Sequence, residues 1–381
     1  MLPYRTGTFY KKYYKWEISH LMKILLLLPT QSSRFSDLYN VFNDLHMGLG
    51  KIGYKSEIVE IKKSGVEGFP YSTVRNIEID ALGRFINDNV SDDTYFVTVD
   101  DIDVMKEISR IGKIQNFLVW AHYFFGARFI FKRYRQKPYE NFGVKRHHNL
   151  FGLVPSNIFG LIGRSYYSAL KNNGIVAQSL WTDLLMERVY NIDVKGVLYI
   201  PIEASYYVTS KEKEDKVLIF LGNDMETDLY SLESAIRKIT RINSRIEFDS
   251  FGNRDTMDFF NKRFNRNIKY LGKLERKDLN TEYSRHLATI APIYNGNFEM
   301  VPIQSLLCGT PVISFMQPFM EVTGRSSMIA NIQNINDVEV KSGKWINRIY
   351  DNADELTQRI LGIMGNDIIA EEMVHKYLLV S

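Results

Sequence analysis

The segment Tyr294–Phe315, YNGNFEMVPIQSLLCGTPVISF, contains the residues best suited to bind an anion. Pro302 suits the first turn of a helix, where its missing N–H costs nothing, and Gly309 can end that helix in a left-handed conformation. The helix start near Glu299–Val301 then directs free backbone N–H groups into the space beyond the sheet. Unpaired donors and the helix macrodipole suit a phosphate. The same pattern also fits an ordinary buried helix.

Short apolar segments alternate with helical patterns in the first half of the chain, which indicates a parallel α/β sheet. A helix is expected to begin at Ser36, with Gly48, Gly50 and Gly53 ending it. The expected strands are Ile24–Leu28, Glu57–Ile61, Tyr95–Val99, Phe117–Trp120, Ile175–Gln178 and Val197–Ile200.

A second α/β series follows a charged stretch at 208–216, which we interpret as an interdomain linker. Strands are expected in KVLIFLGND, IEFDSFGN, IKYLGKL, ATIAPIY and PVISF, with a helix around Leu232–Ile239. We therefore predict two tandem Rossmann-like domains, 22–207 and 217–381, with the last helix packing back on the first. Residues 1–21 are interpreted as an N-terminal extension.

Length, net charge and cysteine content limit the partners and the compartment that we expect for this protein. The chain has 381 residues and a net charge of +4, which does not indicate nucleic acid as a partner. Cys308 is the only cysteine, so no intrachain disulfide can form and a reducing cytoplasm is favoured. The apolar run Ile24–Leu28 is too short to span a bilayer and lacks a signal-peptide cleavage pattern. We expect a cytoplasmic protein, with peripheral membrane attachment left open.

The segment LLCGTPVISF closely resembles EAMACGTPVI of the retaining GT-B glycosyltransferases of glycosyltransferase family 4. Looser similarities follow in the family's order, among them FLVWAHYFFG, which resembles the strand that presents His122 to the cleft. The resemblance covers roughly residues 22–370, about the span of a two-domain unit. It implies two domains facing a central cleft and sugar transfer from a nucleotide-diphosphate sugar, without a metal or other cofactor.

The family has two glutamates around the helix start, and these positions hold Gly296 and Gln304 here. By the resemblance, Gln304 contacts the ribose hydroxyls, while Glu299 and His122 are the catalytic candidates, with Glu299 turned towards the sugar hydroxyls. The other residues assigned to the donor in this way are Asn297, Met300, Val301, Gly222, Asn223, Arg34, Arg254 and Lys273. The last three are cations that would replace the family's Arg–Lys pair, whose positions hold Asn223 and Asp228.

Asp101 and Asp103 in TYFVTVDDIDVMKE allow a different interpretation. They resemble the DxD motif of metal-dependent GT-A glycosyltransferases, where paired carboxylates hold a divalent metal on the nucleotide diphosphate. The same acids suit the cap of the following helix. We favour the cap, because the second half of the chain has no place in a GT-A fold, and we assign no metal site.

Two further questions stay open at the level of sequence. The loss of the glutamates and of the basic pair also fits an inactive GT-B-like subunit kept for binding or assembly. Residues 126–163 combine Lys and Arg with Phe and Tyr beside an apolar run. This composition suits an anionic membrane surface, a polyanionic acceptor or nucleic acid, or an ordinary solvated loop over a buried helix. The acceptor is therefore left unidentified, with a glycan, a lipid-linked molecule and a protein as the alternatives.

Overall fold

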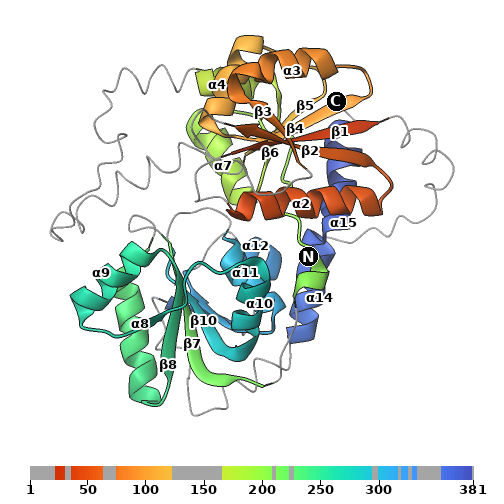
Figure 1. Ribbon diagram of the computed structural model, residues 1–381. Helices are drawn as coiled ribbons and strands as arrows, with labels where there is room; N and C mark the ends of the chain where they lie inside the picture. The colour runs from red at the N-terminus through yellow and green to blue at the C-terminus, as the bar shows by residue number, and fades with distance from the viewer. Residues whose placement is uncertain are drawn as a thin grey trace.

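The protein consists of two α/β domains that lie one above the other in Figure 1, as seen in a computed structural model. The structure describes residues 22–30, 36–62, 74–121, 165–207, 212–222, 227–293, 299–315, 319–324, 328–332 and 353–379. All statements below concern these residues.

The first domain is built on a parallel sheet of six strands in the order β3-β2-β1-β4-β5-β6. The strands are β1 (Lys23–Pro29), β2 (Lys55–Lys62), β3 (Arg75–Glu78), β4 (Thr94–Val99), β5 (Phe117–Ala121) and β6 (Gly174–Ala177). The central strand β1 is buried along almost its whole length. Strands buried on both faces read as continuous apolar runs, which explains why KILLLLP was recognisable in the sequence.

Helices cover both faces of this sheet. One face packs against α2 (Ser36–Lys51), whose apolar side chains join those of β1 in one core. The other face packs against further helices, among them the short η2 (Ile79–Ala81), α3 (Leu82–Asn89), α4 (Ile102–Ile111) and α7 (Leu180–Tyr190). The segment from β6 to the second domain includes a further turn of helix, η5 (Ala204–Tyr206).

The second domain repeats this arrangement. Its six parallel strands have the order β12-β11-β10-β7-β8-β9. They are β7 (Glu214–Leu221), β8 (Glu247–Gly252), β9 (Lys269–Tyr270), β10 (His286–Ala291), β11 (Val312–Ser314) and β12 (Ile329–Asn331). In each domain the first and fourth strands are central neighbours, which is the strand order of a Rossmann fold.

The helices of the second domain also lie on both faces of its sheet. The helices α8 (Leu229–Ile242) and α9 (Arg254–Phe264) cover one face. The other carries α10 (Arg276–Arg285) and α11 (Met300–Leu307), with α12 (Met320–Thr323) following β11.

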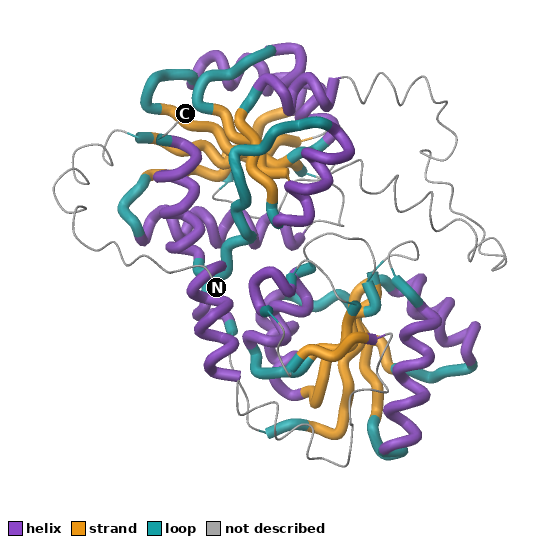
Figure 2. Tube along the Cα trace, turned by 180° about the vertical axis from the view of Figure 1, so that it is seen from behind, coloured by secondary structure: helices purple, strands orange, loops and turns teal. Residues whose placement is uncertain are grey.

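The chain then returns to the first domain through three helical segments. They are α14 (Ala353–Met364), α15 (Asn366–Glu372) and a π-helical turn, η7 (Met373–Leu378). Figure 1 shows α14 beside the second domain and α15 beside the first, and Figure 2 shows the same connection from behind. Side chains of α15 and η7, including Ile369, Met373 and Tyr377, share one apolar core with α2 and β1. This core continues into the second domain through α11 and α14.

The two Rossmann-like domains confirm the predicted fold class. Three local expectations were wrong. Val197–Ile200 is not a strand, since only Val197 forms an isolated bridge with Ala177. Strand β7 begins at Glu214, inside the stretch interpreted as a linker.

The third error concerns α2, which continues through Gly48 and Gly50 to Lys51 and ends only before Gly53, whose φ is 91°. A Cβ atom on Gly48 would lie 2.0 Å from the backbone oxygen of Asn366, whereas one on Gly50 would meet nothing within 4 Å. Gly48 is therefore inside the helix because α15 approaches its backbone at this point.

Candidate active site

The candidate site lies at the carboxyl ends of β7 and β10, which are the central pair of the second sheet. Ligands of open α/β sheets bind outside the carboxyl ends of the strands at such a topological switch point. Gly222 directly follows β7, and α11 begins after β10. The ends of β8 and β9 contribute Arg254 and Lys273 to the same edge.

The start of α11 carries backbone donors at this edge. Glu299 is the N-cap residue, with φ −80° and ψ 125°, and its side chain makes no capping hydrogen bond. Pro302 is the third residue of the helix and has no N–H, so the donors of the first turn are those of Met300 and Val301. With the positive end of the macrodipole, they make this terminus suitable for an anion.

Packing fixes α11 in this position. Ile303, Leu306 and Leu307 are buried against the core, as the sequence pattern indicated. The helix ends before Gly309, whose φ of 69° lies in the left-handed region. The buried hydroxyl of Ser305 donates to Thr289 Oγ1 of β10 at 2.8 Å, which ties the helix to the strand before it.

Gln304 lies one turn along α11 and is half-buried. The hydroxyl of Tyr283 on α10 donates a hydrogen bond to Gln304 Oε1 at 3.4 Å. Tyr283 itself is fully buried, and nothing in the local sequence pattern marked it as a neighbour of the site. The amide of Gln304 is thus held from the protein side at a position that the resemblance assigns to the ribose.

Two described cations lie at this edge, and both are exposed. Arg254 is the first residue of α9, and its side chain is 74% exposed, with Nε 3.7 Å from Asp258 Oδ2. Lys273 follows Gly272, whose φ is 94°, in the loop between β9 and α10. Among the other sequence-predicted positions, those outside the described residues are His122, Asn297, Asn223 and Arg34, together with the segment 126–163.

Asp228, at one position of the family's basic pair, is a helix cap. Its Oδ1 accepts hydrogen bonds from the backbone N–H groups of Tyr230 and Ser231, both at 3.1 Å. The carboxylate therefore serves the first turn of α8.

Asp101 has the same function in the first domain. Its Oδ1 accepts from the N–H groups of Asp103 at 3.0 Å and Val104 at 3.1 Å, so it caps α4 as favoured above. The neighbouring Asp100 accepts a hydrogen bond from the hydroxyl of Tyr166 at 2.7 Å. The GT-A alternative is wrong, because the chain forms two parallel sheets. No group of three His, Cys, Asp or Glu suited to a metal occurs within the described part of the chain.

A buried polar cluster at the carboxyl ends of β1, β2 and β4 was missed by the sequence analysis. Thr30 donates a hydrogen bond to Glu60 Oε1, and both side chains are almost fully buried. Asp100 lies at the end of β4, the other neighbour of β1. A signal was present, since Glu60 interrupts the apolar and buried run Ile58–Ile61 near the carboxyl end of β2.

Two carboxylates connect the domains on either side of the site. Asp44 of α2 accepts two hydrogen bonds from Arg276, the first residue of α10. Glu321 of α12 accepts the backbone N–H groups of Leu180 at 2.8 Å and Trp181 at 3.0 Å, which are the first two residues of α7. Burial raises the pKa of Glu321 although these bonds oppose it. Because α7 and α12 follow strands of different sheets, the carboxyl edges of the two sheets meet here.

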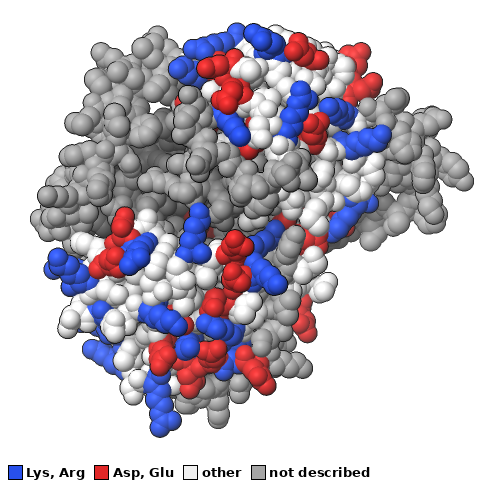
Figure 3. All heavy atoms as spheres, in the orientation of Figure 1, with Lys and Arg blue, Asp and Glu red and all other residues white. Residues whose placement is uncertain are grey.

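Both signs of charge are mixed on the described part of the face that Figure 3 shows. In Figure 3, Lys and Arg side chains alternate with Asp and Glu over the described part of this face in both domains. No described helix is long and apolar enough to cross a membrane.

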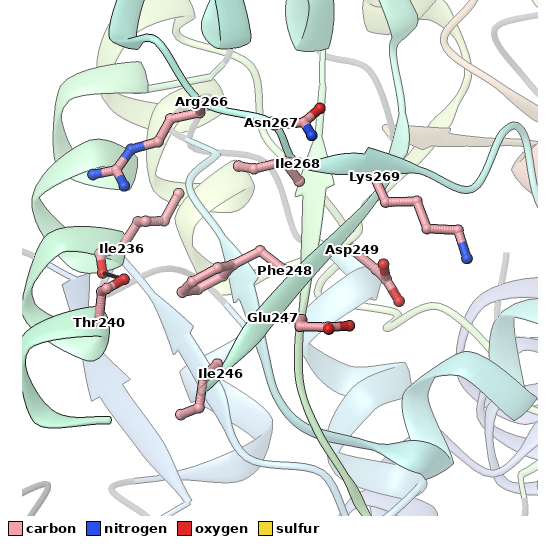
Figure 4. A pocket seen from close by; sticks show the side chains of 10 residues that line it. All are labelled: Ile236, Thr240, Ile246, Glu247, Phe248, Asp249, Arg266, Asn267, Ile268 and Lys269. Carbon is pink, nitrogen blue, oxygen red and sulfur yellow. Dashed lines mark hydrogen bonds between the residues drawn. The ribbon is translucent and has the colours of Figure 1, made fainter. Parts of the chain in front are cut away.

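A hollow of about 400 Å³ lies elsewhere, at the amino end of β8. Figure 4 shows Ile236 and Thr240 of α8 on one side of it and Lys269 on the other, with Phe248 between them. Its position at the opposite end of the strands separates it from the candidate site.

Comparisons with known proteins bear on the family and the fold of this chain. Residues 215–342 match the family model described as glycosyl transferases group 1. No curated protein matches the sequence.

Among solved structures, sucrose-phosphate synthase from Thermosynechococcus elongatus superposes with a TM-score of 0.66 at 14% identity, covering 93% of this chain and 98% of that one. TarM gives a TM-score of 0.62 at 8% identity over 94% and 99% of the two chains. An α-glucosyltransferase in complex with UDP and a 13-mer DNA gives 0.59 at 11% identity over 93% and 99%. At these identities the likeness shows the fold, which is GT-B.

Proposed function

We propose that this chain, a glycosyltransferase by its matched domain and its GT-B fold, transfers a sugar from a nucleotide-diphosphate sugar bound at the start of α11. The observation that carries the proposal is the N-terminus of α11 at the switch point of the second sheet, with the two backbone donors of its first turn. Such a terminus stabilises negative charge that develops on a departing diphosphate.

In this proposal, different residues around the start of α11 bind different portions of the donor. The N–H groups of Met300 and Val301 bind the diphosphate, and Gln304 binds the ribose. Glu299, at the N-cap, turns towards the hydroxyls of the transferred sugar. Arg254 and Lys273, which lie at the same edge, supply positive charge.

Because backbone donors and cations neutralise the diphosphate, we propose that the reaction needs no metal ion. From the resemblance to retaining enzymes of this fold, we further propose that it retains the configuration of the sugar. The acceptor hydroxyl approaches from the first domain, whose sheet edge carries the buried polar cluster of Thr30, Glu60 and Asp100. A glycan, a lipid-linked molecule and a protein all offer such a hydroxyl. Solved structures of this fold include complexes with UDP and with DNA, which supports a nucleotide donor and leaves the acceptor class open.

The test is a measurement of thermal unfolding with UDP-, GDP- and ADP-sugars, followed by detection of released nucleoside diphosphate. A ligand specific to the native state raises the melting temperature by mass action. Gln304→Ala should weaken binding by about 1–2 kcal/mol, the contribution of one hydrogen bond. Gln358→Ala, which removes an exposed glutamine on α14, is the matched control and should bind like the unmodified protein. Equal affinities for all three proteins would place the donor away from α11.

A further inference from the structure

The side chain of Gln304 differs from a glutamate in a way that matters at a diol. A carboxylate presents two equivalent acceptor oxygens, so a rotation by half a turn changes nothing. An amide presents one acceptor and one donor, and its two orientations are chemically different. A glutamine at this position therefore works only if something fixes which end faces the ligand.

The structure provides such a group in Tyr283. Its hydroxyl donates to Gln304 Oε1 at 3.4 Å, and its side chain is fully buried while Gln304 is half-buried. The amide oxygen thus faces the interior. Because the two branches of an amide diverge, Nε2 is directed away from the phenol.

Tyr283 is itself held firmly. Its ring packs edge-on against Phe251, with centroids 6.1 Å apart and an interplanar angle of 82°. Its backbone carbonyl accepts a hydrogen bond from Thr310 Oγ1 at 2.6 Å. The phenolic hydroxyl is therefore a donor at a fixed place, as an orienting group requires.

We infer that Tyr283 is a positioning residue that selects one orientation of the Gln304 amide, so that Nε2 donates to a ribose hydroxyl oxygen of the donor nucleotide. This inference rests on the proposed function, in which α11 binds that nucleotide. In this arrangement the ribose hydroxyl accepts the hydrogen bond from Nε2. A carboxylate at position 304 has no proton to give, so the same hydroxyl would then act as the donor.

The experiment is a double-variant cycle of four proteins (unmodified, Tyr283→Phe, Gln304→Glu and the double variant), with Gln304→Ala and Tyr377→Phe as two reference variants. UDP, GDP and ADP are titrated calorimetrically, and the tightest of them is used throughout. Tyr283→Phe should weaken binding about fivefold when residue 304 is glutamine, the effect of one hydrogen bond of about 1 kcal/mol. With glutamate at 304, the same change should alter the dissociation constant by less than about twofold, because a carboxylate needs no orientation.

A purely structural effect of Tyr283 would weaken binding by the same factor in both backgrounds, and that result would overturn the inference. The inference would also be overturned if Tyr283→Phe left binding unchanged with glutamine at position 304 while Gln304→Ala still weakened it. The proposed function would then stand. If Gln304→Ala binds as tightly as the unmodified protein, the site itself is wrong and both proposals fall. Tyr377→Phe removes a hydroxyl that bonds Val197 O in the first domain, and serves as the control for loss of a tyrosine hydroxyl.

Discussion

Arg276 of the second domain donates two hydrogen bonds to the Asp44 carboxylate of the first, at 2.7 and 2.6 Å. Their side chains are only 14% and 3% exposed, so the pair is buried between the domains. Asp44 Oδ2 also accepts the backbone N–H of Glu203, and the Tyr207 hydroxyl accepts from Arg276 at 3.3 Å. A pair with this geometry fixes the relative position of α2 and α10.

Removal of Arg276 should destabilise the protein strongly. Arg276→Met leaves a buried carboxylate without its cation, which costs about 3–5 kcal/mol of unfolding free energy. Burial already raises the pKa of Asp44, and loss of the cation raises it further. The cost should therefore be smallest where Asp44 is protonated and should grow as rising pH ionises its carboxyl group. Urea unfolding at several pH values measures this. Arg254→Met, at an exposed pair, is the control and should change stability by less than about 0.5 kcal/mol.

Glu203 should make stability sensitive to acid. Burial acts to raise its pKa, but hydrogen bonds from Lys51 and Ser205 outweigh burial and lower the pKa to about 2 from 4.5. The stabilisation is therefore present above about pH 4.5 and lost as pH falls towards 2. Lys51→Met should cost about 1–3 kcal/mol at pH 7, with the difference from the unmodified protein shrinking across that window.

The control for this prediction is Lys376→Met, because Lys376 forms an exposed i,i+4 pair with Glu372. It should cost less than about 0.5 kcal/mol at every pH. A pH-independent difference for Lys51→Met would show that packing of the lysine stem, and not the charge on Glu203, is what the substitution removes.

Alanine at the two glycines of α2 should have opposite effects. Gly48→Ala places a Cβ 2.0 Å from Asn366 O and must displace α15, with an expected loss of about 1–3 kcal/mol. Gly50→Ala meets nothing within 4 Å and should gain about 0.5–1 kcal/mol from helix propensity. Thermal unfolding of both variants provides the comparison, and a stabilising Gly48→Ala would refute the close approach of the two helices.

Transferase activity should be the same with excess chelator as with added Mn²⁺. The proposed site neutralises the diphosphate with backbone donors and cations, and Asp101 is occupied as the cap of α4. Asp101→Asn retains a capping side chain and should leave activity unchanged. A strict metal requirement, together with loss of activity in Asp101→Asn, would contradict the proposal.

The local rules of helix and strand formation predicted much of this fold. Continuous apolar runs identified the central strands, and Pro302 with Gly309 marked the helix that carries the candidate site. The error at Val197–Ile200 has a physical reason, since an apolar run of that length also fits a buried connection. Its Leu198 and Ile200 are buried in the core without a strand partner beyond the single bridge at Val197.

The features that could not be predicted depend on residues distant in sequence. Asp44 and Arg276 are 232 positions apart, and neither stands in a pattern that marks it as an interface residue. Gly48 read as a helix breaker, because its partner Asn366 approaches only after the whole second domain has been traversed. Tyr283 likewise became a candidate only once α10 was placed beside α11. The roles assigned to Glu299 and Gln304 remain predictions.

The path of α15 has a consequence for the order of folding during synthesis. Residues 366–378 leave the ribosome after the entire second domain, yet Ile369, Met373 and Tyr377 complete the core of the first. Until they emerge, the nascent first domain exposes the apolar face of α2 and β1, which is a surface that chaperones and misfolded neighbours recognise. The first domain can therefore complete its core only after the second domain has been synthesised, although the first domain is the one that is translated first.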